Sequence, residues 1–380
     1  MGVRTLDEQS TQTREQDEAS LPTQEDTTIV SDKNPQAVVN QEQQIRIRQQ
    51  AHHHLQARQW SQAEDMFLQL LAYDAQDKDA LLGIATALDE QSKFEALHNL
   101  AQHILEFTPD SAQALAFKAR ALQKLERLSA ATIANDQALL LDTNLGLAWI
   151  NRSGLQLLQG KFPEALRSSQ RALELAPEDS RAWANKGVAL LNFNRLSEAL
   201  DAFDRSLECD EQQTFALQMK GEILCRIGRM REVVPLVQRS LALNPNNPNA
   251  LMQGIQAVRA LEMYDSLKEL AHALLQLLPD NLFAWDNYMR GLRGLGQFEE
   301  ADAALNRLLE LDPGNFRFWT LKADTLYRME HYRDAANAAE RARSLEPDYP
   351  PALRIHDKAL RLMYQRKGIR RQKPDDVPQL

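Results

Sequence analysis

Three consecutive histidines, His52, His53 and His54, are the residues of this chain whose type most readily suggests metal chemistry. Imidazole is a common ligand of zinc and other transition metals. Successive side chains on a helix point about 100° apart, so three in a row cannot converge on one ion as an i, i+4 pair would. We therefore interpret them as part of a solvated or partly packed helical face, and we predict no metal and no cofactor.

The nucleophilic and acidic residues form no catalytic pattern. The sequence contains no phosphate-binding GxxxxGK[ST] loop, no GxSxG nucleophile elbow and no HExxH metalloprotease motif. Cys209 and Cys225 have neither CxxC nor metal-ligand spacing, so we interpret them as reduced thiols. We predict that the chain is not an enzyme and has no catalytic residues.

Composition restricts the fold class and the kinds of partner. The 380 residues are 43% apolar but only 6% aromatic, and alanine and leucine recur throughout, which favours an all-α fold. The net charge of -9 argues against nucleic-acid binding, which needs a basic face. No apolar run reaches the about 18 residues of a membrane span, and residues 1–30 lack the apolar core of a secretory signal, so we expect a cytoplasmic protein.

Most of the chain follows a repeating pattern of 34 residues. Residues 146–213 contain two tandem copies of this pattern without a gap, so that Trp149 recurs as Trp183 and Leu173 as Leu207. The same frame covers residues 44–349 in nine units, which start at residues 44, 78, 112, 146, 180, 214, 248, 282 and 316. Each unit predicts one helix pair, and the pairs are expected to stack into a solenoid.

Large and small residues recur at fixed positions of the unit. The fourth position is always bulky, the eighth is small in seven of nine units, the seventeenth is large and the twentieth is mostly alanine. Gly160, Gly228 and Gly296 share the fifteenth position, where a left-handed residue can end the first helix. Proline stands at the thirty-second position of six units and stops the second helix. Large side chains are expected to fit into small sites where two helices approach.

These columns resemble the tetratricopeptide repeat, which carries Trp or Leu, Gly or Ala, a large aromatic, Ala, Phe, Ala and Pro at the same positions. The resemblance covers residues 44–349 and implies an all-α superhelix of antiparallel helix pairs, in which the first helix of each pair lines a concave groove. We expect residues 350–366 to form a cap helix and residues 367–380 a flexible tail. The polar residues 1–43 are predicted to be a disordered tail, although a helix could begin near Pro35 or Gln36.

In this family the second, fifth, sixth, ninth, twelfth and thirteenth positions face the groove. From the sixth unit onward they are rich in arginine. The predicted partner-binding residues are Asn185, Phe215, Arg226, Asn249, Arg259, Phe283, Asn287, Arg290, Arg293, Arg317, Tyr327, Arg328, Arg354 and Lys358. The hypothesis is that units five to nine hold an acidic segment of a partner protein. The alternative is that the arginines pair with neighbouring carboxylates such as Glu222, Asp286 and Asp324 and keep the groove hydrated.

The resemblance implies a scaffold or adaptor that binds protein partners. The alternative is an accessory or recognition subunit of an enzyme complex. Family members that grip chaperone C-terminal tails carry a set of Lys, Asn and further basic residues across three units, and Asn151, Asn185 and Asn287 lack the rest of that set, so chaperone-tail binding is not expected.

Two local features leave alternatives open. Repeat seven has Ile255, Leu267 and Leu274 where the family prefers small residues, which indicates compensated packing or else a hinge or side pocket. Residues 361–373 contain six basic residues and no acid. They are interpreted as a solvated end of the cap helix, with docking to an acidic surface or anionic lipid as the alternative.

Overall fold

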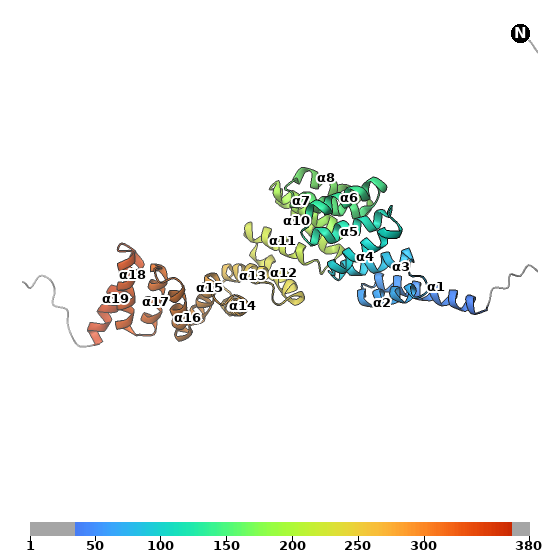
Figure 1. Cartoon of the computed structure of the whole chain (residues 1–380). Coiled ribbons are helices and arrows are strands. Elements are labelled where there is room, and N and C mark those ends of the chain that lie inside the picture. The colour runs from blue at the N-terminus through green and yellow to red at the C-terminus, as the bar shows by residue number, and fades with distance from the viewer. Residues whose placement is uncertain (1–34, 367–380) are drawn as a thin grey trace, which may run out of the picture. The chain divides into compact units, whose positions relative to one another are not determined.

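The computed structural model describes residues 35–366, and every regular element in that range is a helix (Figure 1). The first helices of the nine repeats are α1 (Pro35–Gln56), α3 (Lys78–Glu90), α5 (Ala112–Lys124), α7 (Gly146–Leu158), α9 (Ser180–Asn192), α11 (Thr214–Arg226), α13 (Pro248–Ala260), α15 (Leu282–Gly294) and α17 (Phe316–Arg328). The second helices are α2 (Trp60–Leu71), α4 (Phe94–Phe107), α6 (Leu128–Leu141), α8 (Phe162–Leu175), α10 (Leu196–Cys209), α12 (Met230–Leu243), α14 (Tyr264–Leu277), α16 (Phe298–Leu311) and α18 (Tyr332–Leu345). The last helix is α19 (Pro350–Arg366).

The helices follow the 34-residue frame closely. From α3 to α17, each first helix begins at the first residue of its repeat. The residue just before it often accepts a hydrogen bond from the unpaired N–H groups of the first turn, as Ser111 does from Ala114 and Asn281 from Ala284. Short polar side chains are preferred at this capping position, so its recurrence sets the same start in successive repeats.

The fifteenth position of every repeat has a left-handed backbone. The φ angles there lie between 56° and 80°. These residues are Arg58, Ser92, Glu126, Gly160, Asn194, Gly228, Glu262, Gly296 and Glu330. Three are the glycines that the sequence pointed to, and the other six make the same reversal with a side chain, which is a strained conformation.

At the amino-terminal boundary the structure shows the alternative in which a helix begins near Pro35, and not a disordered tail that extends to residue 43. Helix α1 begins at Pro35, ahead of the repeat frame at Gln44, so residues 35–43 are helical and do not belong to a disordered tail. Proline is favoured in the first turn because its missing N–H group has no partner to lose there. Residues 1–34 and the expected flexible tail, residues 367–380, lie outside the described residues.

The helices divide into two compact parts within α3, between residues 83 and 84. In the first part α1 packs against α2, and Phe67 of α2 is fully buried. A Cβ atom added at Gly83 would lie 2.4 Å from the Phe67 ring, so a residue without a side chain is needed at this contact. Arg48 of α1 pairs with Asp77, at 2.5 Å.

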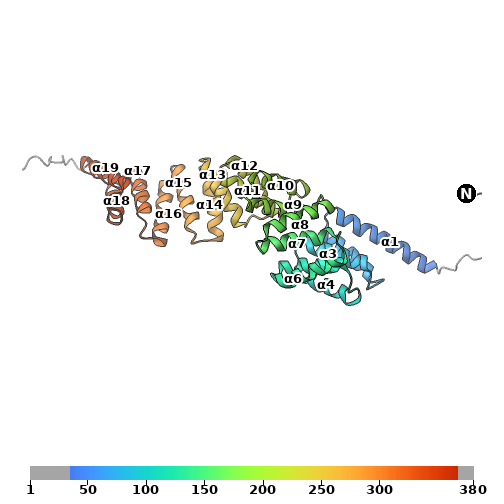
Figure 2. The same ribbon diagram turned by 90° about the horizontal axis from the view of Figure 1, so that it is seen from above.

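In the second part, consecutive helices pack against one another from repeat to repeat. Figure 2 shows α13, α15 and α17 in one row and α14, α16 and α18 in the other. Helices α5, α7, α9 and α11 also contact the next first helix directly, and α17 contacts α19, whereas no two second helices within the described chain make a comparable contact. The first helices therefore lie on the inner, more closely spaced side of the stack, which we call the inner face.

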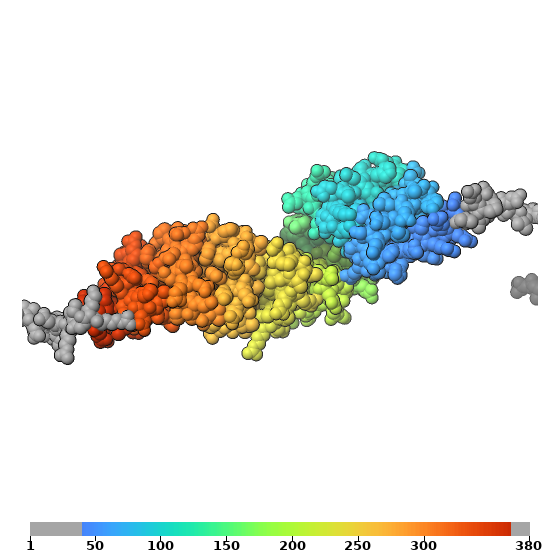
Figure 3. Space-filling view, turned by 90° about the horizontal axis from the view of Figure 1, so that it is seen from below, coloured from blue at the N-terminus to red at the C-terminus, as the bar shows by residue number. Residues whose placement is uncertain are grey.

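Large side chains fill small sites in this part. Phe203 is fully buried, and a Cβ atom added at Gly187 would lie 2.8 Å from its ring. In repeat seven, Ile255, Leu267 and Leu274 are all fully buried in one apolar cluster, which supports compensated packing. In Figure 3 the repeats coloured from yellow to red form one continuous surface.

Helix α19 closes the last repeat by packing against α18 and α17. Its Ala352 and Ala359 are fully buried, and Ile355 packs on the apolar cluster around Ala323 of α17. None of the described helices combines the length and the apolar character that crossing a membrane requires.

Candidate protein-binding surface

Amide side chains at the sixth position tie neighbouring first helices together on the inner face. Their nitrogens donate to main-chain oxygens 35 residues earlier: Asn151 to Ala116 (2.8 Å), Asn185 to Ile150 (3.2 Å) and Gln253 to Gln218 (3.0 Å). Asn185, a predicted partner contact, also donates to Ser153 Oγ, at 2.8 Å. Its amide nitrogen is therefore engaged within the fold, and its carbonyl oxygen is the group left for a partner.

The inner face of repeats two to five carries its own ion-pair cluster. Asp89, at the end of α3, is 6% exposed and accepts from Arg120 Nε at 3.0 Å and from Arg181 Nη1 at 2.8 Å. Arg181 also pairs with Asp179 at 2.7 Å. Arg120, Arg181, Asp89 and Asp179 are therefore already paired with one another, and the exposed Lys124 in the same half lies 5.9 Å from the centre of the Phe94 ring.

Burial and pairing shift the pKa values of this cluster in opposite directions. Burial alone would lower the pKa of Arg181, but Asp179 and Asp89 hold it above its ordinary value. Burial alone would raise the pKa of Asp179, but Arg181 holds it below 3.8. Beside them, burial raises the pKa of Glu90 and lowers that of Lys124.

The sequence prediction did not include this cluster. Arg120 and Arg181 do stand at the ninth and second positions of their repeats, which the family resemblance assigns to the groove. Arg181 and Asp89 are 92 residues apart, however, and no 34-residue period brings them together. The contact between Arg181 and Asp89 depends on the angle by which each repeat is rotated relative to the one before it. This angle is seen only in the folded structure.

Three of the predicted arginines pair with carboxylates on the inner face of repeats eight and nine. Asp324 of α17 accepts from both Arg293 and Arg328, the latter at 3.0 Å. Arg290 donates to Asp286 of its own helix, at 2.8 Å. Burial lowers the pKa of Arg293, and Asp324 opposes that shift. For these three side chains the structure favours the alternative in which arginines pair with neighbouring carboxylates.

Four other predicted arginines have only neutral partners. Arg226 donates to Asn194 Oδ1 at 3.3 Å, Arg259 to Asn287 Oδ1 at 3.5 Å and Arg354 to the Pro350 oxygen at 3.3 Å. The Arg317 guanidinium lies 5.7 Å from the centre of the Phe316 ring. Within residues 35–366, none of the four is within ion-pair distance of a carboxylate. All four are exposed, as is Lys358 of α19.

The remaining predicted residues differ in exposure. Asn249 is exposed and Phe215 is 43% exposed, so both can meet a partner. Phe283 and Tyr327 are half-buried. Asn287 is fully buried and donates to the Phe283 oxygen at 2.7 Å, so we assign it to positioning Arg259 and not to direct contact.

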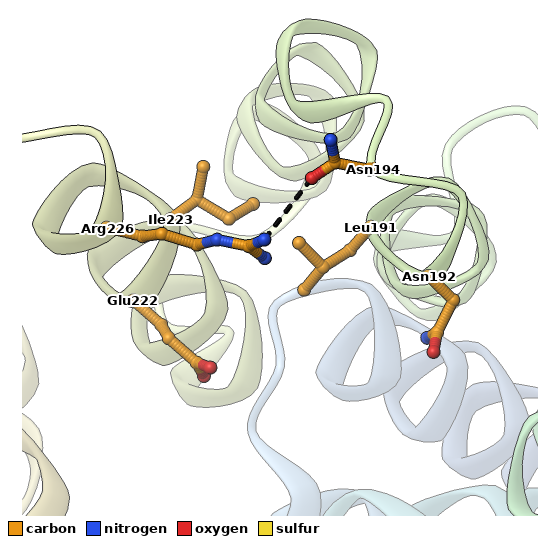
Figure 4. A pocket seen from close by; sticks show the side chains of 6 residues that line it. All are labelled: Leu191, Asn192, Asn194, Glu222, Ile223 and Arg226. Carbon is orange, nitrogen blue, oxygen red and sulfur yellow. Dashed lines mark hydrogen bonds between the residues drawn. The ribbon is translucent and has the colours of Figure 1, made fainter.

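An open pocket of about 460 Å³ lies beside Arg226, between the carboxyl ends of α9 and α11. Its lining residues, shown in Figure 4, are Leu191, Asn192, Asn194, Glu222, Ile223 and Arg226. Arg226 extends across the pocket towards Asn194, while the Glu222 carboxylate points away from the guanidinium (Figure 4). The sequence identified Arg226 as a partner-binding residue but not Asn194. Asn194 is the fifteenth residue of its repeat, a position that indicates only a turn.

The histidines and cysteines take separate structural roles. His52 lies 3.2 Å from Asp79, and His54 lies 2.6 Å from Gln59. Cys209 and Cys225 are not joined to each other by a disulfide, and burial raises the pKa of both thiols. No group of His, Cys, Asp and Glu in the described part of the chain has an arrangement that could hold a metal ion.

Comparisons with known proteins find the same repeat. Two family models, both described as tetratricopeptide repeat, match residues 48–96 and 155–214 and residues 282–325. Neither describes a catalytic domain. No protein with curated annotation matches the sequence.

Several solved structures are similar to the chain. A crystal structure of the APC/C hetero-tetramer Cut9–Hcn1 is 17% identical over 79% of this chain, with a TM-score of 0.46, and the match spans 59% of that chain, less than two thirds of its length. Pseudomonas aeruginosa PilF is 22% identical, with a TM-score of 0.47, over 57% of this chain and 98% of its own. YrrB, described as a TPR protein with an unusual peptide-binding site, is 20% identical, with a TM-score of 0.32, over 59% of this chain and 98% of its own.

Proposed function

Since the chain is a tetratricopeptide repeat protein, a class that generally mediates protein–protein interactions, we propose that it is an adaptor that holds an acidic segment of a partner protein. The segment lies on the inner face of repeats six to nine. It contacts the arginines of α11, α13 and α17 and the basic residues of α19. The chain binds and positions its partner and carries out no chemistry itself.

The observation that carries this proposal is the contrast between the two ends of the inner face. In repeats two to five, Arg120 and Arg181 pair with Asp89 and Asp179. In repeats six to nine, Arg226, Arg259 and Arg317 are exposed and have only neutral partners. The other three arginines of the predicted set in these repeats, Arg290, Arg293 and Arg328, pair with carboxylates. A guanidinium without a carboxylate keeps most of its donors available, and a carboxylate is the group that uses them best.

The affinity has to come from several weak contacts. An exposed ion pair contributes about 0.2–1 kcal/mol, so no single arginine can hold a peptide. A row of them also accelerates the encounter with an acidic segment, and this effect weakens as salt rises. The exposed ring of Phe215 supplies apolar contact area beside the charges.

We place the adaptor in the cytoplasm. The two cysteines of the chain, Cys209 and Cys225, have no spacing typical of a disulfide framework or a metal site, which is consistent with a reducing compartment.

Site-specific photocrosslinking in the native cell tests the proposal. A photoreactive residue replaces Asn249 on the inner face, and a matched one replaces Gln238, which is exposed on the second helix α12. We expect position 249, and not position 238, to capture a segment rich in Asp and Glu. Capture of a neutral or basic segment, or equal capture from both positions, would contradict the proposal. If the acidic segment belongs to an enzyme, the chain is an accessory subunit of that enzyme.

A further inference from the structure

The pocket between α9 and α11 is lined by both polar and aliphatic side chains. Arg226 and Asn194 supply the polar groups, whereas the partly exposed Leu191 supplies the aliphatic surface, since Ile223 is only 1% exposed. Figure 4 shows the guanidinium of Arg226 reaching towards Asn194, with Ile223 and Leu191 on different sides of the Arg226 side chain. A matching side chain must therefore have an aliphatic stem and a polar end.

The polar groups beside the stem are hydrogen-bond donors. Arg226 uses one N–H group on Asn194 Oδ1, at 3.3 Å, which leaves four further donors on the guanidinium. Because Asn194 Oδ1 accepts that bond, the nitrogen of the same amide is the group that can turn to a ligand. Arg226 is exposed and has no carboxylate partner within residues 35–366. The polar end of the ligand side chain must therefore be an acceptor, and a carboxylate is the best one for a guanidinium.

We propose that this pocket takes a glutamate side chain of the bound partner. This inference rests on the proposed function and assigns one subsite within it. The methylene groups of the glutamate lie on Leu191, and its carboxylate accepts from Arg226 and from the Asn194 amide. Aspartate, which is one methylene shorter, loses about fourfold in affinity because it buries less aliphatic surface. Glutamine has the same length but lacks the charge.

Glu222 provides a second prediction, in which a substitution changes the affinity for glutamate in the opposite direction from a substitution of Arg226. Its carboxylate lines the same pocket and points away from Arg226 (Figure 4). A bound carboxylate experiences it as a like charge, which weakens binding. Glu222→Gln is therefore expected to strengthen glutamate binding, whereas Arg226→Gln weakens it.

The pocket can be tested with a model of one glutamate residue. N-acetyl-L-glutamate N-methylamide is titrated into the full-length chain while NMR follows the side-chain amide of Asn194. We expect a saturable shift that is smaller with the aspartate and glutamine counterparts, weakened roughly tenfold in Arg226→Gln and strengthened in Glu222→Gln. Arg231→Gln is the matched control, because Arg231 is an exposed arginine on the neighbouring helix α12 and the charge change is the same. The backbone spectrum of each variant shows whether it is folded.

Equal shifts with the glutamate and glutamine compounds, or an unchanged titration in Arg226→Gln, would overturn this proposal. The absence of any shift at Asn194 in the natural chain would do the same. These outcomes are separate from the fate of the proposed function, which depends on Arg259 and Arg317. If acidic peptides bind through those two arginines while the pocket stays empty, only the pocket assignment fails.

Discussion

Asp89 and Arg181 are 92 residues apart in the sequence, yet Asp89 Oδ2 and Arg181 Nη1 lie 2.8 Å apart. The contact joins the end of α3 to the start of α9 across the inner face of the second compact part. Arg120 binds the other oxygen of the same carboxylate at 3.0 Å. One buried carboxylate therefore pairs with two guanidinium groups, of which Arg181 also pairs with Asp179.

Replacement of this carboxylate is expected to destabilise the fold strongly. Asp89→Asn leaves Arg120 and Arg181 without their shared counter-charge, and the loss of one partner from a buried ion pair costs about 3–5 kcal/mol. The free energy of unfolding can be measured by urea denaturation. Glu174→Gln is the control, because Glu174 pairs with Arg171 on the surface and should change stability by less than about 1 kcal/mol. If Asp89→Asn lowers the free energy of unfolding no more than the control does, the ion-pair cluster does not stabilise the fold.

The same cluster predicts a specific dependence on pH. The pKa of Asp179 is lower in the fold than the ordinary 3.8 because Arg181 outweighs the effect of burial. A depressed carboxylate pKa contributes stability above 3.8, and this contribution is lost as the pH falls through the folded-state pKa. Asp179→Asn keeps the helix cap, since asparagine caps as well as aspartate.

Unfolding free energies of the natural chain and Asp179→Asn should therefore differ at neutral pH and converge in acid. Thermal melts over a pH series provide the measurement. A constant difference down to the lowest pH would mean that the aspartate charge is not what stabilises this site.

The contact between Phe203 and Gly187 predicts a steric effect. A Cβ atom at position 187 would lie 2.8 Å from the ring, and both residues are buried, so Gly187→Ala should destabilise the fold by about 1–3 kcal/mol. Phe203→Leu added to that variant should recover part of the loss. Gly314→Ala is the matched control, because no atom lies within 4 Å of the added Cβ there. If Gly187→Ala and Gly314→Ala melt alike, the packing interpretation is wrong.

The left-handed turn residues predict a stabilising substitution. Glu262 has a φ of 56° at the position where other repeats have glycine. A left-handed backbone costs a residue with a side chain about 1–2 kcal/mol, so Glu262→Gly should raise the free energy of unfolding by up to that amount. Gly228→Ala tests the reverse change in the neighbouring repeat and should lower it. A stabilising Gly228→Ala would contradict the strain argument.

The repeat architecture was predictable because its signals are local and periodic. Capping residues such as Ser111 and Asn281, and turn glycines such as Gly160, recur every 34 residues and mark helix ends without reference to the rest of the fold. The start of α1 was less certain because Pro35 lies outside the period.

The candidate surface was predictable only in part. Arg290 and Asp286 are four residues apart on one helix, so their pairing could be anticipated. The burial of Asn287 and the approach of Arg181 to Asp89 depend on the packing of separate helices, which a sequence period does not encode. Position in the repeat therefore identifies which residues share the inner face, but not which of them are already paired.

The most direct test of the central claim measures how inner-face charge controls peptide binding. A fluorescein-labelled peptide of alternating glutamate and alanine is titrated with the natural chain, with Arg259→Glu/Arg317→Glu and with Arg333→Glu, which changes an exposed arginine on the second helix α18. The account predicts that fluorescence anisotropy will show a salt-dependent affinity that falls about tenfold or more in the double variant and little in the control. Equal affinity of the natural chain and the double variant, or no binding by the natural chain, would contradict it.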